Sequence, residues 1–154
     1  MARITWITKQ EKINEIIKHA HICSIAMIDT EGNPYVVIMN FGFKDGIFYF
    51  HGNVKGKKME ALKKNPKVSI MLSTDHKLTH QHENVACSYS MHYKSVSVQG
   101  SVEFIEDYEK KTEALSIIMG QYTGKEFTFS TPSVNGVAIF IVRAEDLKCK
   151  EFGL

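Results

Sequence analysis

The sequence predicts a mainly β protein in which six or seven antiparallel strands form a small closed or split barrel, with two or three peripheral helices. Successive apolar runs are joined by short turns, as in an antiparallel sheet. The chain lacks both the regular strand–helix alternation of a Rossmann fold and its GxGxxG motif. A length of 154 residues corresponds to one domain at about 150 residues per domain, so we expect residues 1–154 to form a single domain.

The first half of the chain predicts one helix and three strands. Thr8 and Glu11 have the T-x-x-E spacing of a capping box, and isoleucines follow at helical spacing. Asp45-Gly46 is a hairpin signal between two apolar runs. The predicted elements are a helix over Thr8–Ala20 and strands over His21–Asp29, Tyr35–Phe43 and Ile47–His51.

The second half predicts two more helices and the remaining strands. Asp107 is a plausible N-cap residue, and Tyr108, Leu115, Ile118 and Met119 form an apolar stripe behind it. The segment from 75 to 86 is polar and lacks periodicity, which predicts a loop. The predicted elements are helices over Lys57–Lys64 and from Asp107 to Met119, one or two strands over Tyr89–Ile105, strands over Lys67–Ser73 and Gly136–Arg143, and a short edge strand over Lys148–Phe152.

Composition excludes several classes of partner. Lys plus Arg number 19 and Asp plus Glu 17, and a net charge of +2 is too small for nucleic acid or an anionic membrane as the main partner. No uncharged apolar run approaches the roughly 18 residues of a membrane span, and Met1–Lys9 lacks the apolar region of a signal peptide.

The chain has three cysteines, an odd number, and they are widely spaced at Cys23, Cys87 and Cys149. We expect a cytoplasmic protein in which each cysteine is a free thiol serving as a small buried hydrophobe.

The segment FHGNVKGKK carries the strongest chemical signal. Gly52 and Gly56 let the backbone approach a ligand closely, and Lys55, Lys57 and Lys58 supply positive charge. The helix that follows offers free N–H groups at its start. Together these features indicate a site for a phosphate dianion, although not a Walker A loop. The alternative is a solvated basic turn before a helix.

Three other features have less specific patterns. Asn40 lies in an otherwise apolar strand, where it could bind the edge of a heterocycle or make a hydrogen bond inside the barrel. Lys94 or Ser95 could contact the same phosphate, although a solvent-facing Lys94 is favoured by the sequence. The polar loop holds three histidines, His76 and His80 among them at i, i+4 spacing, but no HExxH motif. We therefore expect no metal site.

Four short motifs occur in order along the chain, namely GNPY, YFHGNVKGKK, NPKV and KSVSVQG. They match the recurring pieces G-x-P-Y, Y-F-H-[SG]-A-x-x-G-[RH]-K, N-P-x-V and R-S-V-x-x-x-G. From about residue 10 to about 145 the chain thus resembles the pyridoxamine 5'-phosphate oxidase-like FMN-binding split barrels, and more closely their nitroimidazole-resistance-type branch. The chain departs from the usual residues at four positions. Asn53 replaces Ala, and Ile38 replaces Pro. Lys57 stands where Arg or His is common, and Lys94 stands where Arg is common. The lysines keep the charge but lose the fork geometry of arginine.

The resemblance implies FMN as the cofactor and a homodimer with the flavin at the interface. The implied site has three parts: residues that hold the phosphate, residues that line the ring and ribityl chain, and residues that meet the flavin at the end of the third strand. The implied phosphate ligands are Lys57, Lys58 and Ser95. The implied lining of the ring and ribityl chain is Met39, Asn40 and Phe41. The residues implied at the end of the third strand are His51, Gly52 and Asn53.

Hydrophobic patterning also favours a dimer. The strands Tyr35–Phe43 and Ile47–Phe50 are apolar on both faces, whereas a small antiparallel sheet normally leaves one face in water. Burying both faces requires the barrel interior on one side and a partner subunit on the other. A small barrel also has too little interior for FMN, whereas a cleft between two copies is concave.

The function implied by the resemblance is an FMN-dependent oxidoreductase. Electrons would pass from a nicotinamide donor to a small planar acceptor such as a nitroaromatic compound. His51 would donate a proton or orient the acceptor, or would only contact the flavin. A non-catalytic flavin- or haem-binding protein is the alternative, with the histidine loop as the reason to consider haem. Oxidation of pyridoxamine phosphate is not favoured, because the chain ends in CKEFGL without an arginine-rich segment.

Overall fold

The computed structural model describes residues 2–153, and within them it contains nine strands and four α-helices. The strands are β1 (Arg3–Ile7), β2 (Cys23–Ile28), β3 (Pro34–Met39), β4 (Gly42–Lys44), β5 (Ile47–Gly52), β6 (Lys67–His80), β7 (Tyr89–Ile105), β8 (Ala138–Arg143) and β9 (Asp146–Gly153). The helices are α1 (Gln10–His19), α2 (Lys57–Lys64), α3 (Tyr108–Thr123) and α4 (Thr131–Asn135), with a 3-10 turn at Ala86–Ser88. None of the helices described is long and apolar enough to cross a membrane.

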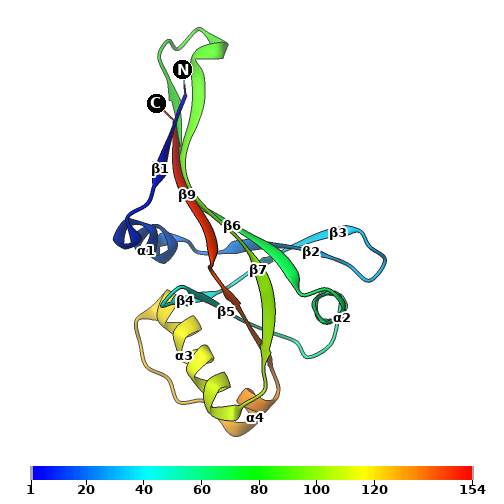
Figure 1. Cartoon of the computed structure of the whole chain (residues 1–154). Helices are drawn as coiled ribbons and strands as arrows, with labels where there is room; N and C mark the ends of the chain where they lie inside the picture. The colour runs from blue at the N-terminus through cyan, green and yellow to red at the C-terminus, as the bar shows by residue number, and fades with distance from the viewer. Residues whose placement is uncertain (1, 154) are drawn as a thin grey trace.

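The long strand β7 organises the sheet. The strand order is β3-β2-β6-β7-β8-β5-β4, and β9 lies between β7 and β1. The first part of β7 pairs with β6 and β9, whereas residues 102–105 pair with β8, so β7 belongs to both halves of the barrel (Figure 1). Every recorded strand pair is antiparallel. The predicted split-barrel class, mainly β and antiparallel, is confirmed.

Aromatic rings fill the centre of the barrel. Phe41, Phe48, Phe50 and Phe140 are all fully buried, and the ring centroids of Phe50 and Phe140 lie 5.1 Å apart. The helix α1 adds its isoleucines to the same core. The helices α3 and α4 form a second cluster with β5 and β8, in which Tyr49 is partly buried. The outer face of β5 is therefore partly covered by its own chain, which leaves less of it for a partner subunit than the sequence predicted.

The structure has two strands more than the upper prediction of seven. One is β1, which pairs with β9. The other arises because the predicted strand Tyr35–Phe43 breaks at Asn40 and Phe41 into β3 and β4. The strand β9 spans Asp146–Gly153 and is paired on both sides, so it is not the short edge strand that was predicted.

Several local predictions change for identifiable reasons. The helix α1 has Lys9 as its N-cap with no side-chain cap, because Thr8 immediately follows β1; the predicted capping box is wrong. The segment that was predicted as a loop from Asp75 continues as β6 to His80, because β7 provides a pairing edge for it. Asp107 caps α3 as predicted, by accepting the Lys110 N–H at 3.0 Å. Tyr108, however, is 38% exposed and lies outside the buried stripe.

Turn and cysteine predictions are confirmed in part. Asp45 (φ 51°) and Gly46 (φ 77°) form the predicted hairpin turn, with the two positive φ values of a type I′ turn. The short helix α4 follows its N-cap Ser130 and was not predicted. Cys23 and Cys149 are buried as expected, whereas Cys87 in the 3-10 turn is exposed, contrary to the prediction.

Candidate functional site

The basic loop predicted as a phosphate site connects β5 to α2. β5 ends at Gly52, which pairs with Ala138 of β8, and the loop reaches Gly56, the N-cap of α2. Gly56 has φ 124° and ψ 174°, a conformation that L side chains rarely adopt. Since Gly56 has no side chain to cap the helix, the first N–H groups of α2 have no side-chain partner at the N-cap.

Lys58 lies directly over Gly52. A Cβ atom placed on Gly52 would be 3.3 Å from the Lys58 Nζ and 3.5 Å from its Cε, so the absence of a side chain lets the lysine approach the backbone. Burial lowers the pKa of Lys58. None of the ion pairs found among residues 2–153 includes Lys58. A partly buried ammonium without a carboxylate partner is expected to bind an external anion favourably.

His51 is a titratable neighbour of this cation. It is partly buried on β5, opposite Ile139. Burial lowers the pKa of His51, and the charge of Lys58 lowers it further. The imidazole is therefore neutral at pH 7, and it can either accept or donate a hydrogen bond.

Lys57 has a different environment from its neighbour Lys58. Its Nζ lies 3.8 Å from the Asp29 Oδ2 and 4.3 Å from the centroid of the Tyr35 ring. Asp29 also accepts the backbone N–H groups of Glu31 and Asn33 at the β2–β3 turn. The hydrogen bond from Asn33 is the main cause of the lowered pKa of Asp29. Lys57 thus links α2 to the β2–β3 hairpin, whereas Lys58 is partly buried and is in none of the ion pairs found among residues 2–153.

The predicted ring-lining segment lies at the break between β3 and β4. Met39 is buried, Asn40 is exposed, and the fully buried ring of Phe41 packs against Phe48 at a centroid distance of 5.7 Å. The exposure of Asn40 excludes the alternative of a hydrogen bond inside the barrel. A ligand at this break would meet the side chain of Asn40 and the backbone of Phe41, not the Phe41 ring.

Tyr122 on α3 fixes this break, and the sequence analysis missed it. Its hydroxyl accepts the Phe41 N–H at 3.1 Å and donates to the His21 carbonyl at 2.9 Å. Phe41 and Tyr122 are 81 residues apart, so no local pattern could have indicated the contact. Asp29 was also missed, although an aspartate directly before a Thr-Glu-Gly-Asn turn is a recognisable signal.

Ser95 lies in another part of the chain. It is buried on β7, between Ser73 of β6 and Lys150 of β9. The loop after Gly52 instead lies beside the end of β8 that pairs with Ile105. Ser95 and Ile105 are ten positions apart on β7, roughly 33 Å along the strand. Within one chain, the structure brings together Gly52, His51 and Lys58 but gives Ser95 different neighbours.

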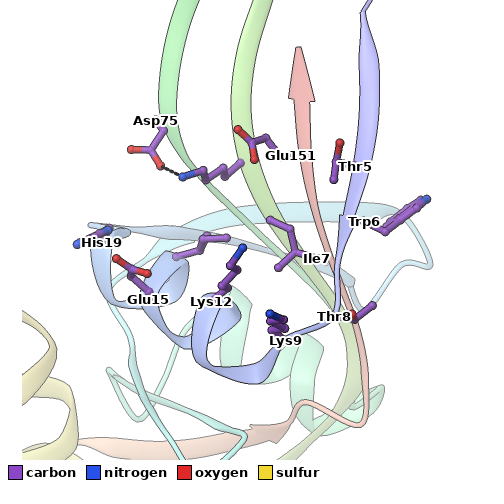
Figure 2. Close-up of a pocket in the computed structure, with 12 residues that line it drawn as sticks. Thr5, Trp6, Ile7, Thr8, Lys9, Lys12, Glu15, His19, Asp75 and Glu151 are labelled. Carbon is purple, nitrogen blue, oxygen red and sulfur yellow. Dashed lines mark ion pairs between the residues drawn. The ribbon is translucent and has the colours of Figure 1, made fainter. Parts of the chain in front are cut away.

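Lys94 has the opposite orientation from Ser95. Its ammonium pairs with the Asp75 carboxylate at 3.3 Å and faces a hollow of about 490 Å³ between α1, β1 and the β6–β7 hairpin (Figure 2). The predicted solvent-facing lysine is therefore partly buried and paired. Lys12 and Glu15 of α1 line the same hollow.

In the structure, His76 and His80 of the predicted histidine loop contact different residues and not each other. The Nε2 of His76 lies 2.8 Å from the Ser73 hydroxyl, and the His80 ring packs on the Tyr89 ring at a centroid distance of 4.8 Å.

Burial raises the pKa of the Cys23 thiol to about 12, so this cysteine does not form a reactive thiolate near neutral pH.

The fold first defines the class, an antiparallel split-barrel protein. The family model described as pyridoxamine 5'-phosphate oxidase matches residues 9–144, and the chain therefore belongs to the pyridoxamine 5'-phosphate oxidase family. A comparison with curated proteins finds no match.

Solved structures agree with this assignment. A Bacteroides thetaiotaomicron VPI-5482 protein whose suggested role is 5-nitroimidazole antibiotic resistance is 42% identical, with a TM-score of 0.88, over 100% of this chain and 90% of that one. An FAD- and haem-binding protein from Mycobacterium smegmatis has a TM-score of 0.81 at 14% identity, over 94% and 72%. An FAD-binding protein from Mesorhizobium loti has a TM-score of 0.66 at 21% identity, over 98% of both chains. The last two likenesses concern the fold alone.

Proposed function

We propose that this protein is a flavin-dependent oxidoreductase that binds FMN at the Gly52–Lys58 loop. The observation that carries the proposal is Lys58, a partly buried cation without a carboxylate partner, held against a glycine next to the N-terminus of α2. A phosphate dianion satisfies both the ammonium and the uncapped helix N–H groups. Gly52 leaves room for the lysine stem, and Asn53 is exposed beside it.

The chemistry comes from the cofactor. When bound, FMN would carry electrons from a nicotinamide donor to a small planar acceptor. The similar Bacteroides protein favours 5-nitroimidazoles as that acceptor class. The neutral His51 imidazole would orient the acceptor through a hydrogen bond, because burial and, second, the Lys58 charge lower its pKa and leave it without a proton to transfer at pH 7.

The site is proposed to be shared between two copies of the chain. The outer face of β3 and β6 exposes large apolar side chains, with Val36 61%, Ile38 67% and Met71 49% exposed. Burying such a face in a two-fold dimer is favourable. Because Ser95 lies far along β7 from the loop, a serine that helps to bind the phosphate would come from the second copy. We place the dimer in the cytoplasm, where the exposed free Cys87 suits a reducing compartment.

Two measurements test this proposal. In a fluorescence-quenching titration FMN should bind much more tightly than riboflavin, since riboflavin lacks the phosphate; equal affinities would refute the loop as the phosphate site. FMN-loaded protein should then oxidise a nicotinamide in the presence of a 5-nitroimidazole. Tight FMN binding without any nicotinamide oxidation would leave a flavin carrier in place of an oxidoreductase.

A further inference from the structure

The hollow that Lys94 faces, about 490 Å³ in volume, lies between α1, β1 and the β6–β7 hairpin (Figure 2). Pockets that bind small molecules have volumes of about 300–1,000 Å³, so this hollow is large enough for a ligand. None of the residues that line it belongs to the Gly52–Lys58 loop or to the break between β3 and β4. The proposed flavin site therefore does not account for it.

The strand side of the hollow carries charges that already have partners. A bulge in β6 gives Asp75 a φ of 57°, and bulges of this kind redirect a side chain. The Asp75 carboxylate lies 3.3 Å from the Lys94 ammonium. The Glu151 carboxylate lies 2.7 Å from the Nε2 of His92. This side of the hollow is therefore held in place by its own contacts and leaves little free charge for a ligand.

The helix side of the hollow carries charges without such partners. Lys12 and Glu15 both line the hollow and are three residues apart on α1. Neither is in any of the ion pairs found among residues 2–153. Residues at this spacing have Cβ atoms about 5–6 Å apart. Figure 2 shows the Lys12 side chain pointing from α1 toward the strands. This wall therefore presents a cation and an anion side by side.

The start of α1 strengthens the positive end of this wall. Lys9 is the N-cap residue of α1, makes no side-chain cap and also lines the hollow. The first N–H groups of a helix lack backbone partners, and the helix dipole favours an anion beside them. Glu15 lies about a turn and a half further along the helix from Lys9. The wall thus has an end that suits an anion, near Lys9 and Lys12, and an end that suits a cation, at Glu15.

Two isoleucines give the hollow an apolar part. Ile16 of α1 is 5% exposed, and Ile7, the last residue of β1, is partly exposed. Both line the hollow together with the charged groups. An apolar group of a ligand can therefore be removed from water beside its charged end, which is favourable.

We propose that this hollow binds an α-amino acid with an apolar side chain. The carboxylate binds Lys12 and the start of α1, and the ammonium binds Glu15. The side chain packs against Ile7 and Ile16. An α-amino acid carries its two charges on one carbon atom, which suits a cation and an anion three residues apart on one helix. A simple anion would leave Glu15 without a partner, and a simple amine would leave Lys12 without one. The inference does not depend on the proposed flavin site.

The first test compares three probes by isothermal titration calorimetry on the protein as purified. The probes are L-leucine, 3-methylbutylamine, which lacks the carboxylate, and 4-methylpentanoate, which lacks the ammonium. L-leucine should bind at least about 10-fold more tightly than either analogue, because each analogue loses one hydrogen bond between charged groups. Equal binding of L-leucine and 4-methylpentanoate would overturn the amino-acid assignment. No binding of L-leucine at millimolar concentration would overturn the site.

The second test uses substitutions on α1 with matched controls. Lys12→Met should weaken L-leucine and 4-methylpentanoate but not 3-methylbutylamine, whereas Glu15→Gln should weaken L-leucine and 3-methylbutylamine but not 4-methylpentanoate. Lys18→Met and Glu11→Gln are the controls, since both residues are exposed on the same helix and neither lines the hollow. The controls should leave L-leucine affinity unchanged, and circular dichroism checks the folding of all four variants. Equal losses in Lys12→Met and Lys18→Met would mean that binding follows surface charge alone and would overturn the proposal.

Discussion

Removing the charge of Lys58 is the sharpest perturbation of the proposed phosphate site. Lys58→Met keeps the aliphatic stem over Gly52 and removes the ammonium that lies 3.3 Å from the Cβ position there. A hydrogen bond to a charged group is worth about 1.5–3 kcal/mol, which corresponds to roughly 10- to 150-fold in affinity. We expect FMN affinity to fall by that factor and riboflavin affinity to stay unchanged. The assay is fluorescence quenching with each flavin at fixed ionic strength.

Lys57→Met is the matched control. Lys57 differs because its side chain is 60% exposed and its ammonium lies 3.8 Å from the Asp29 carboxylate. Exposed ion pairs contribute at most about 1 kcal/mol, so FMN affinity should fall less than in Lys58→Met. Equal losses of FMN affinity in the two variants, or wild-type FMN binding by Lys58→Met, would refute Lys58 as the phosphate ligand.

Three further predictions concern the supports of the site. Tyr122→Phe leaves the buried Phe41 N–H without an acceptor, so the free energy of unfolding measured in urea should fall by about 1–3 kcal/mol. An unchanged free energy of unfolding would mean that water replaces the hydroxyl as acceptor. Gly42→Ala would place a Cβ 2.7 Å from the Ile118 backbone nitrogen and should cost about 1–3 kcal/mol as an overpacked contact; an unchanged midpoint would show that α3 moves away easily. Because the pKa of His51 is lowered in the folded state, its contribution makes stability fall as pH drops below about 6.5. The His51→Gln variant should lose less stability than the wild type between pH 7.5 and 5.5, and equal losses would contradict the assignment.

The sequence correctly predicted those turns, caps and helix bounds whose signals come from residues close together in the chain. The Asp45-Gly46 turn, the Asp107 cap and the bounds Lys57–Lys64 of α2 all agree with the structure. Each depends on residues within a few positions of one another. The barrel class followed from the same kind of information, because short turns between apolar runs leave few topologies other than antiparallel ones.

Features that depend on distant partners were not predictable in this way. The strand β1 exists because β9 lies beside it, although the two are separated by most of the chain. The polar segment 75–80 forms a strand for a similar reason, since β7 supplies its hydrogen bonds. The different environments of Lys57 and Lys58 depend on Asp29 and on Gly52, which a count of lysines in the loop does not show.

Native mass spectrometry of protein purified without added cofactor tests the central claim most directly. We expect a particle of two chains that carries FMN, and we expect the FMN to be lost when the particle dissociates into single chains. A single chain that carries a full equivalent of FMN would contradict the shared site. A particle that carries haem instead, with an intense Soret band in its visible spectrum, would contradict the flavin assignment itself.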